Sequence, residues 1–122
     1  MPTRSLEIGT FVTDRTTNSV RAGNRTNRTY TATNNGEFQH RQSIGTSEVT
    51  ITLPSSIGDA GLCVIENHDA TNFVDVGFAT GNYPLRVPKG QAMKLWLTPA
   101  TSALYLKADT AACDTSIAVF ER

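Results

Sequence analysis

The chain has 122 residues, of which 39% are apolar and 18% charged, and its 11 basic and 11 acidic residues give a formal net charge of zero. This length suits one domain that buries roughly two-thirds of its unfolded surface without metal or disulfide staples. The charge balance gives no overall attraction to nucleic acid or to a membrane. No apolar run approaches the roughly 18 residues of a membrane span. No apolar signal segment follows Met1, so we expect synthesis in a cytoplasm.

Residues that favour pleated backbone recur in short alternating runs along the chain, and turn residues separate these runs. After Gly45 the runs repeat about every eight to twelve residues, which is typical of a β-sandwich or a small barrel. No segment fits a helix of three turns. We therefore predict an all-β chain of about eight strands. The runs after Gly45 are centred on residues 49–53, 62–66, 74–78, 83–87, 93–97, 104–107 and 117–120.

The segment Leu62–Gly81 holds two of these runs on either side of a polar break. Leu62–Ile65 is apolar at every position, which predicts a central strand that is covered on both faces. The second run predicts a core face made of Val74, Val76 and Phe78. In the break between the runs, we expect side chains to satisfy backbone groups of the turn. These side chains belong to Asn67, Asp69 and Asn72.

The N-terminal part differs in composition from the rest. Residues 5–13 read as a strand that bends at Gly9. Asn, Thr, Gly and Arg dominate the segment that follows, and a short strand fits residues 26–33. Asn34-Asn35-Gly36 is typical of a tight turn. We predict a single domain whose residues 1–45 form a strand and an Arg/Asn/Thr-rich arm, extended or in long loops, and whose residues 46–122 form the sandwich body.

The arm carries several arginines and one tyrosine that are candidates for contact with an acidic protein surface. A solvated loop is the alternative, and binding to phosphate backbones is a third. Because only one aromatic residue lies among the arginines, base stacking and nucleic-acid binding are disfavoured. The candidate contact residues of the arm are Arg15, Arg21, Arg25, Arg28, Tyr30 and Arg41.

Trp96 and Tyr105 occupy alternating positions opposite to those of the leucines beside them. They either fill a second covered face or form an exposed aromatic patch. Exposed aromatic residues mark contact surfaces, and one face of an isolated sandwich sheet is wet. We therefore include both residues among the candidate protein contacts.

The sequence predicts no catalytic, cofactor-binding or metal-binding residues. His68 and Asp69 lie near Glu66 and Asp75, but zinc sites and activated nucleophiles need three converging groups. His68 falls in a turn, where local hydrogen bonding explains such residues. Cys63 and Cys113 lie in apolar runs and read as small buried hydrophobes. A disulfide between them across two strands is the alternative, although cytosolic proteins rarely keep one.

The C-terminal half resembles small virion structural proteins of tailed bacteriophages. The resemblance rests on a strand–turn–strand segment from Asn67 to Gly77, on the turn Pro88-Lys89-Gly90, and on the run Leu104–Ala112 before the last strand. It implies a jelly-roll-like antiparallel β-sandwich that attaches to a capsid or tail without catalysis. The N-terminal arm has no counterpart in this resemblance.

Together these observations predict a capsid cement, or decoration, protein that stabilises the head by binding the major capsid protein. The expected location is the virion, and the expected partners are the major capsid protein or other virion proteins and further copies of the chain, as a dimer or trimer. A tail, neck or fibre-adaptor protein is an alternative in the same class. A carbohydrate-binding sandwich, with Tyr83, Trp96 and Tyr105 as a stacking platform, is an alternative in a different class.

Overall fold

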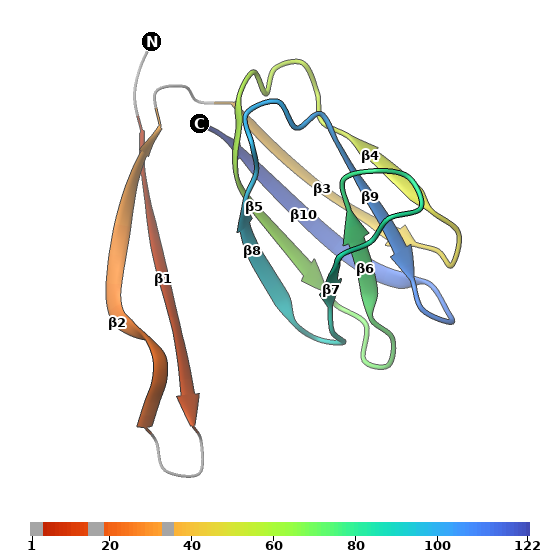
Figure 1. The fold of residues 1–122 in the computed structure, drawn as a ribbon, viewed down its shortest axis with the longest axis horizontal. Helices are drawn as coiled ribbons and strands as arrows, with labels where there is room; N and C mark the ends of the chain where they lie inside the picture. The colour runs from red at the N-terminus through yellow and green to blue at the C-terminus, as the bar shows by residue number, and fades with distance from the viewer. Residues whose placement is uncertain (1–3, 15–18, 33–35) are drawn as a thin grey trace. The chain divides into compact units, whose positions relative to one another are not determined.

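The computed structural model of the chain describes residues 4–14, 19–32 and 36–122 (Figure 1). The chain divides into two compact units, Met1–Asn35 and Gly36–Arg122. Every regular element of the described residues is a β-strand, which confirms the all-β prediction. The strands are β1 (Arg4–Asp14), β2 (Ser19–Ala32), β3 (Glu37–Ile44), β4 (Val49–Thr52), β5 (Ala60–Asn67), β6 (Val74–Gly77), β7 (Leu85–Val87), β8 (Ala92–Trp96), β9 (Ala103–Ala108) and β10 (Cys113–Glu121).

The first unit is an antiparallel pair of β1 and β2. Its register shifts between Ile8 and Thr10, so the irregularity expected at Gly9 is present, and it shifts again after Val12. β2 begins seven residues before the short strand expected at residues 26–33. Its first half is polar, and only pairing with β1 reveals it as a strand, because strand preference depends on the partner. Of the predicted turn, Asn34 and Asn35 lie outside the described residues.

The second unit consists of two four-stranded sheets with the orders β3-β10-β5-β8 and β4-β9-β6-β7 (Figure 1). Every neighbouring pair in these sheets is antiparallel. One cluster of buried aliphatic side chains draws on both sheets, including Ile65, Ile117 and Val119 from the first and Val76 and Leu104 from the second. The unit is therefore a β-sandwich-like fold, which agrees with the predicted antiparallel sandwich.

β5 lies between β10 and β8. This is the central position that its continuous apolar run predicted. Cys63 and Ile65 point into the core and are fully buried. On the opposite face Leu62 is buried but Val64 is only half-buried, so the predicted cover of both faces is incomplete. Both cysteines are buried and free, so the structure holds no Cys63–Cys113 disulfide. Burial raises the pKa of the Cys63 thiol to about 12, which keeps it protonated and unreactive.

Residues 37–44, which the sequence analysis placed in the N-terminal arm, form β3 and pair with β10 along its length. Their side chains alternate between exposed and half-buried, and only Ile44 is fully buried. One face of β3 is exposed, and on the core-facing side only Ile44 is fully buried, so few of its side chains have to be apolar. This explains why the composition of the segment did not reveal it.

Phe78 was predicted to share the core face of Val74 and Val76, and this prediction is wrong. Both valines are fully buried, but the Phe78 side chain is 46% exposed. β6 ends at Gly77, where the backbone of Asn82 approaches so closely that an added Cβ would lie 1.8 Å from the Asn82 carbonyl oxygen. The chain leaves the strand at this contact, so the alternation of faces stops before Phe78.

Of the three side chains predicted to hold the polar break after β5, those of Asn67 and Asp69 bind its backbone, whereas the Asn72 Oδ1 atom accepts from the Thr110 hydroxyl at 2.8 Å. The Asn67 Nδ2 group donates to the carbonyl oxygens of Asn72, at 2.8 Å, and of Val87, at 3.2 Å. Its Oδ1 atom accepts from the amide of Asp69 at 2.9 Å. The Asp69 carboxylate in turn accepts the amides of Asn72 and Thr71, and these bonds lower its pKa.

Asn67 should therefore be the most costly residue of this turn to truncate. Its side chain is buried, with an exposed fraction of 2%, and Asn67→Ala leaves several buried backbone groups without a partner. We expect the free energy of unfolding to fall by about 1–3 kcal/mol, measured by urea denaturation. Asn82→Ala removes the same amide from an exposed turn and should change stability by no more than about 0.5 kcal/mol. Equal effects of the two variants would contradict this role.

Candidate interaction surface

Three aromatic side chains, Phe78, Trp96 and Tyr105, form what we call the aromatic patch. Trp96 is 56% exposed at the end of β8, and Phe78 is 46% exposed just after β6. Two surface depressions adjoin the patch, and Phe78, Thr98 and Thr101 line both of them. Trp96 lines one depression and Tyr105 the other. The three aromatic residues therefore border one continuous surface.

The strands position two members of this patch by simple alternation. Trp96 lies opposite Leu62 in the β5–β8 ladder, on the parity that faces away from the core. Tyr105 lies between the fully buried Leu104 and Leu106 and is half-buried on the outer side of β9. The alternation of inward and outward side chains along each strand therefore identified Trp96 and Tyr105 from the sequence. It missed Phe78, because the contact of Gly77 with Asn82 ends the alternation.

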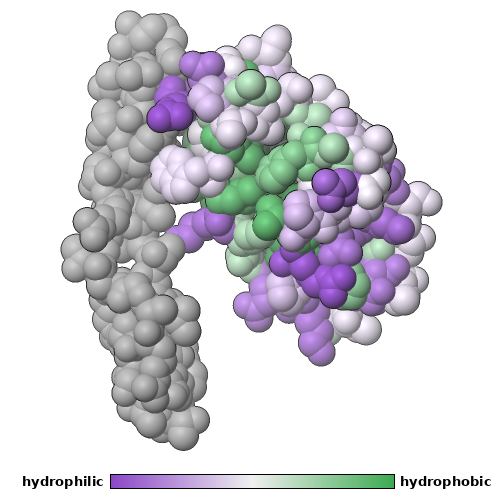
Figure 2. All heavy atoms as spheres, in the orientation of Figure 1, coloured by the Kyte–Doolittle hydropathy of each residue, from purple (hydrophilic) through white to green (hydrophobic). Residues whose placement is uncertain are grey.

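Hydrophobic residues gather in the middle of the face of the second unit that Figure 2 shows, and hydrophilic residues lie around them. Beside the aromatic patch, the hydroxyls of Thr98 and Thr101 lie 3.0 Å apart. The Thr101 amide also donates to the Thr98 carbonyl at 3.0 Å, which closes this turn. The patch is thus amphipathic, with ring faces next to hydroxyl groups.

The loop between Phe78 and Tyr83 is held by the carboxylate of Glu48. This carboxylate accepts hydrogen bonds from the Thr80 hydroxyl at 2.6 Å, the Gly81 amide at 2.8 Å and the Tyr83 hydroxyl at 2.6 Å. The bond from Thr80, followed by that from Tyr83, lowers the pKa of Glu48. The same contact raises the pKa of Tyr83. Tyr83 therefore supports the loop next to the patch.

The Glu48 contacts predict a stability that depends on pH. Because folding lowers the pKa of Glu48, its contribution is present above the ordinary glutamate pKa and is lost as the pH falls through the lowered value. We expect Glu48→Gln to lower Tm at neutral pH, and we expect this difference to shrink in acid, as followed by circular dichroism. Thr80→Ser keeps the hydroxyl and should retain the wild-type profile. A Tm difference that is the same at both pH values would contradict the assignment.

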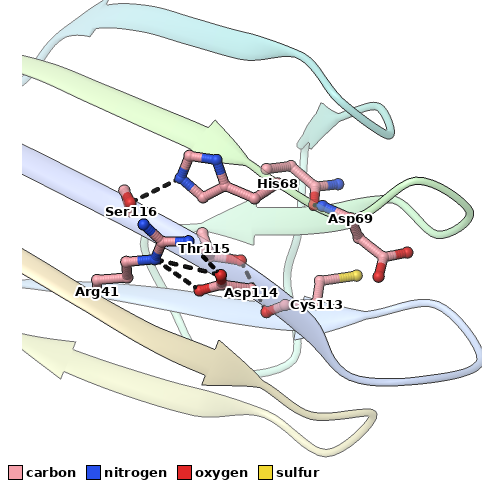
Figure 3. A network of polar contacts seen from close by, with 8 residues as sticks. Arg41, His68, Asp69, Cys113, Asp114, Thr115 and Ser116 are labelled. Atoms are coloured by element: carbon pink, nitrogen blue, oxygen red, sulfur yellow. Dashed lines mark hydrogen bonds and ion pairs between the residues drawn. The ribbon is translucent and has the colours of Figure 1, made fainter.

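A network of polar contacts lies on the outer face of the first sheet (Figure 3). The Arg41 guanidinium donates to the Asp114 carboxylate, with Nε 3.0 Å from Oδ1. This hydrogen bond raises the pKa of Arg41 and lowers that of Asp114. His68 Nε2 lies 2.8 Å from the Ser116 hydroxyl, and the His68 amide donates to the Asp114 carbonyl at 2.9 Å. The network links β3, β10 and the turn after β5.

The His68–Ser116 contact has the distance of a base and a nucleophile, but a working pair also needs a group that orients the histidine. The nearby Asp114 carboxylate is bound to Arg41, and both His68 and Asp114 are exposed on the sheet face. The arrangement is explained by cross-linking of strands. Among the described residues, no group of three or more His, Cys, Asp or Glu side chains could hold a metal ion.

The predicted contact residues of the arm fall in different places. Arg15 lies outside the described residues. Arg21, Arg25, Arg28 and Tyr30 lie on β2, where Arg28 pairs with Ile8 and Tyr30 with Leu6. Arg41 lies on β3 in the second unit, apart from the other arginines in sequence and bound to Asp114. Arg41 is thus part of the sandwich.

No protein-family model, curated protein or solved structure matches the chain. In the part of the chain that the structure describes, no helix is long and apolar enough to cross a membrane.

Proposed function

We propose that this chain is a non-enzymatic structural protein of a tailed-bacteriophage virion, a capsid cement protein that binds the major capsid protein as a homo-oligomer. The strand order of the sandwich carries the proposal. Numbered one to eight from β3 to β10, the strands of the second unit form sheets of order 1-8-3-6 and 2-7-4-5. This is the order of a jelly roll, an architecture that recurs in viral capsid proteins and in lectins. It supports a jelly-roll-like fold.

The charge distribution supports attachment through the N-terminal unit. Residues 1–35 contain five arginines against two acidic residues, a net charge of +3. Residues 36–122 contain six basic and nine acidic residues, a net charge of −3. A basic hairpin joined to an acidic body suits binding to an acidic protein surface, where complementary charge speeds the encounter and selects the partner.

The aromatic patch supports a protein contact as well. Tryptophan and tyrosine are enriched in protein interfaces, where they supply large contact areas at a low cost in conformational entropy. The exposed side chains of Trp96, at the end of β8, and Phe78, just after β6, meet this description. The patch would contact a neighbouring virion subunit while the hairpin contacts another.

Deletion of residues 1–35 tests the role of the hairpin. The remaining Gly36–Arg122 unit keeps both sheets and the core, so we expect it to stay folded by circular dichroism but to lose capsid binding in a cosedimentation assay. The deletion must end before β3, because a cut at residue 41 would remove most of a strand of the first sheet. Normal capsid binding by the truncated protein would contradict the role of the hairpin.

The location in the virion is tested by mass spectrometry of intact particles. A cement protein is expected in copy numbers comparable to those of the major capsid protein, whereas a tail, neck or fibre-adaptor protein is expected in far fewer copies. Purified virions that contain the other structural proteins but lack this chain would refute the proposal. The copy number decides between the head and the tail.

A carbohydrate-binding sandwich is the second candidate, favoured by the Trp96 ring beside the hydroxyls of Thr98 and Thr101. Aromatic rings with a few placed polar groups are typical of small-molecule sites. Under this candidate, a glycan array should show binding that Trp96→Ala abolishes and Trp96→Phe retains in part. Absence of glycan binding by the wild-type protein would remove the candidate.

A further inference from the structure

The four strands at the sheet edges of the second unit differ in how they are protected. β7 has three residues and lies between Pro84 and Pro88, β4 has four residues and β8 has five. β3 has eight residues, contains neither proline nor glycine, and pairs with β10 without a register shift. Among the described strands it pairs only with β10. Proteins often blunt such edges by shortening them or by proline or bulges, because a long regular edge is a template for another strand.

The backbone groups that face the open side of β3 can be assigned. The Glu121 amide donates to the Gly36 carbonyl at 2.7 Å, so the polar backbone groups of Gly36 face β10. In an antiparallel ladder the direction of these groups alternates from one residue to the next. The amides and carbonyls of Phe38, His40 and Gln42 therefore also face β10. Those that face the open edge belong to Glu37, Gln39, Arg41 and Ser43.

The side chains of these edge residues make the strand complementary to itself. When two copies of β3 pair antiparallel about a two-fold axis through Gln39, Glu37 of each copy lies opposite the partner's Arg41. Opposite charges at directly facing positions stabilise a pair of strands. A two-fold axis through Arg41 would instead place two arginines opposite each other. Charge thus selects one register.

The contacts that Arg41 already makes are compatible with this register. Its Nε and Nη2 atoms donate to Asp114, which leaves Nη1 for a second carboxylate. In the same register, Phe38 lies opposite the partner's His40 on the inner face. Within one chain, the rings of Phe38 and His40 already stack, with their centroids 5.7 Å apart. An aromatic pair across the strands would extend this stack.

We propose that β3 is the dimerisation edge of this protein, at which two copies pair antiparallel with Glu37 facing Arg41 and join their β3-β10-β5-β8 sheets into one sheet. The partner is a second copy of the same chain, and main-chain hydrogen bonds supply most of the contact, as in other cases of strand addition. The inference rests on the proposed function for its biological role, since it names the interface of the proposed homo-oligomer.

Variants of the full-length protein test this interface by analytical ultracentrifugation over a concentration series. Wild type should sediment as a dimer at the high end of the series. Gln39→Pro removes an amide that faces the open edge and spares the ladder with β10, so it should be monomeric. The matched control Gln39→Ala keeps the amide and should dimerise like the wild type.

Charge reversal supplies a test that does not depend on proline. E37R and R41E should each weaken the dimer by about tenfold or more, because like charges then face each other. A mixture of the two variants should form a heterodimer, since the introduced arginine faces the introduced glutamate and the two native side chains also face each other. Circular dichroism confirms that each variant is folded. If one is not, the double variant E37Q/Q39E replaces it, because it moves the glutamate away from Arg41 without changing the composition.

The proposal is overturned if the wild type is monomeric throughout the series. It is also overturned if Gln39→Pro and E37R dimerise like the wild type, or if the two charge variants stay monomeric when mixed. These outcomes are independent of the virion assay. A monomeric protein that is found in virions would refute the β3 dimer and the homo-oligomer but keep the proposed virion role, whereas a β3 dimer absent from virions would keep the interface and refute that role.

Discussion

The first sheet depends on the last strand of the chain. β10 pairs with β3, the first strand of the second unit, and with β5, so the sheet exists only when the C-terminal residues are in place. Ile117 and Val119 on β10 enter the same core as Leu104 and Leu106 of the other sheet. The contact between Gly36 and Glu121 spans 85 residues of sequence. Loops of this length carry an entropic cost of closure before their contacts form, which slows the assembly of the sandwich.

Polar side chains fix the loops, which the apolar core does not hold in place. Asn67, Glu48 and Glu121 each bind backbone groups of segments that are distant in sequence. The Glu121 carboxylate accepts the amides of Gly36 and Gly58, and a Cβ added to Gly36 would lie 2.3 Å from it. Buried or half-buried backbone groups need such partners. These contacts therefore decide where the loops lie, including the loop that begins at Phe78.

The β3 edge and Trp96 of the aromatic patch lie at opposite edges of one sheet, since the order β3-β10-β5-β8 puts β3 at one edge and β8 at the other. A dimer joined at β3 would leave one tryptophan at each far edge. Two tryptophan sites on one dimer bind a repetitive surface more strongly than one site does alone, because the second contact forms at a high effective concentration. This arrangement suits the repeated subunits of a virion shell.

Alternation of apolar and polar residues was enough to predict the all-β class and the outward parity of Trp96 and Tyr105. The continuous apolar run Leu62–Ile65 predicted the central position of β5. The hydrogen bonds by which Asn67 and Asp69 close their own turn were also predictable because they are local, but the bond from Asn67 to the Val87 carbonyl was not. Only the tertiary structure decided that polar residues 37–44 form an edge strand, that Phe78 leaves the core, and that the strands follow the order they do. The edge strand depends on β10 and the sheet order on strands far apart in sequence, while the end of β6 depends on how closely the Asn82 backbone approaches Gly77. Local composition does not encode such contacts.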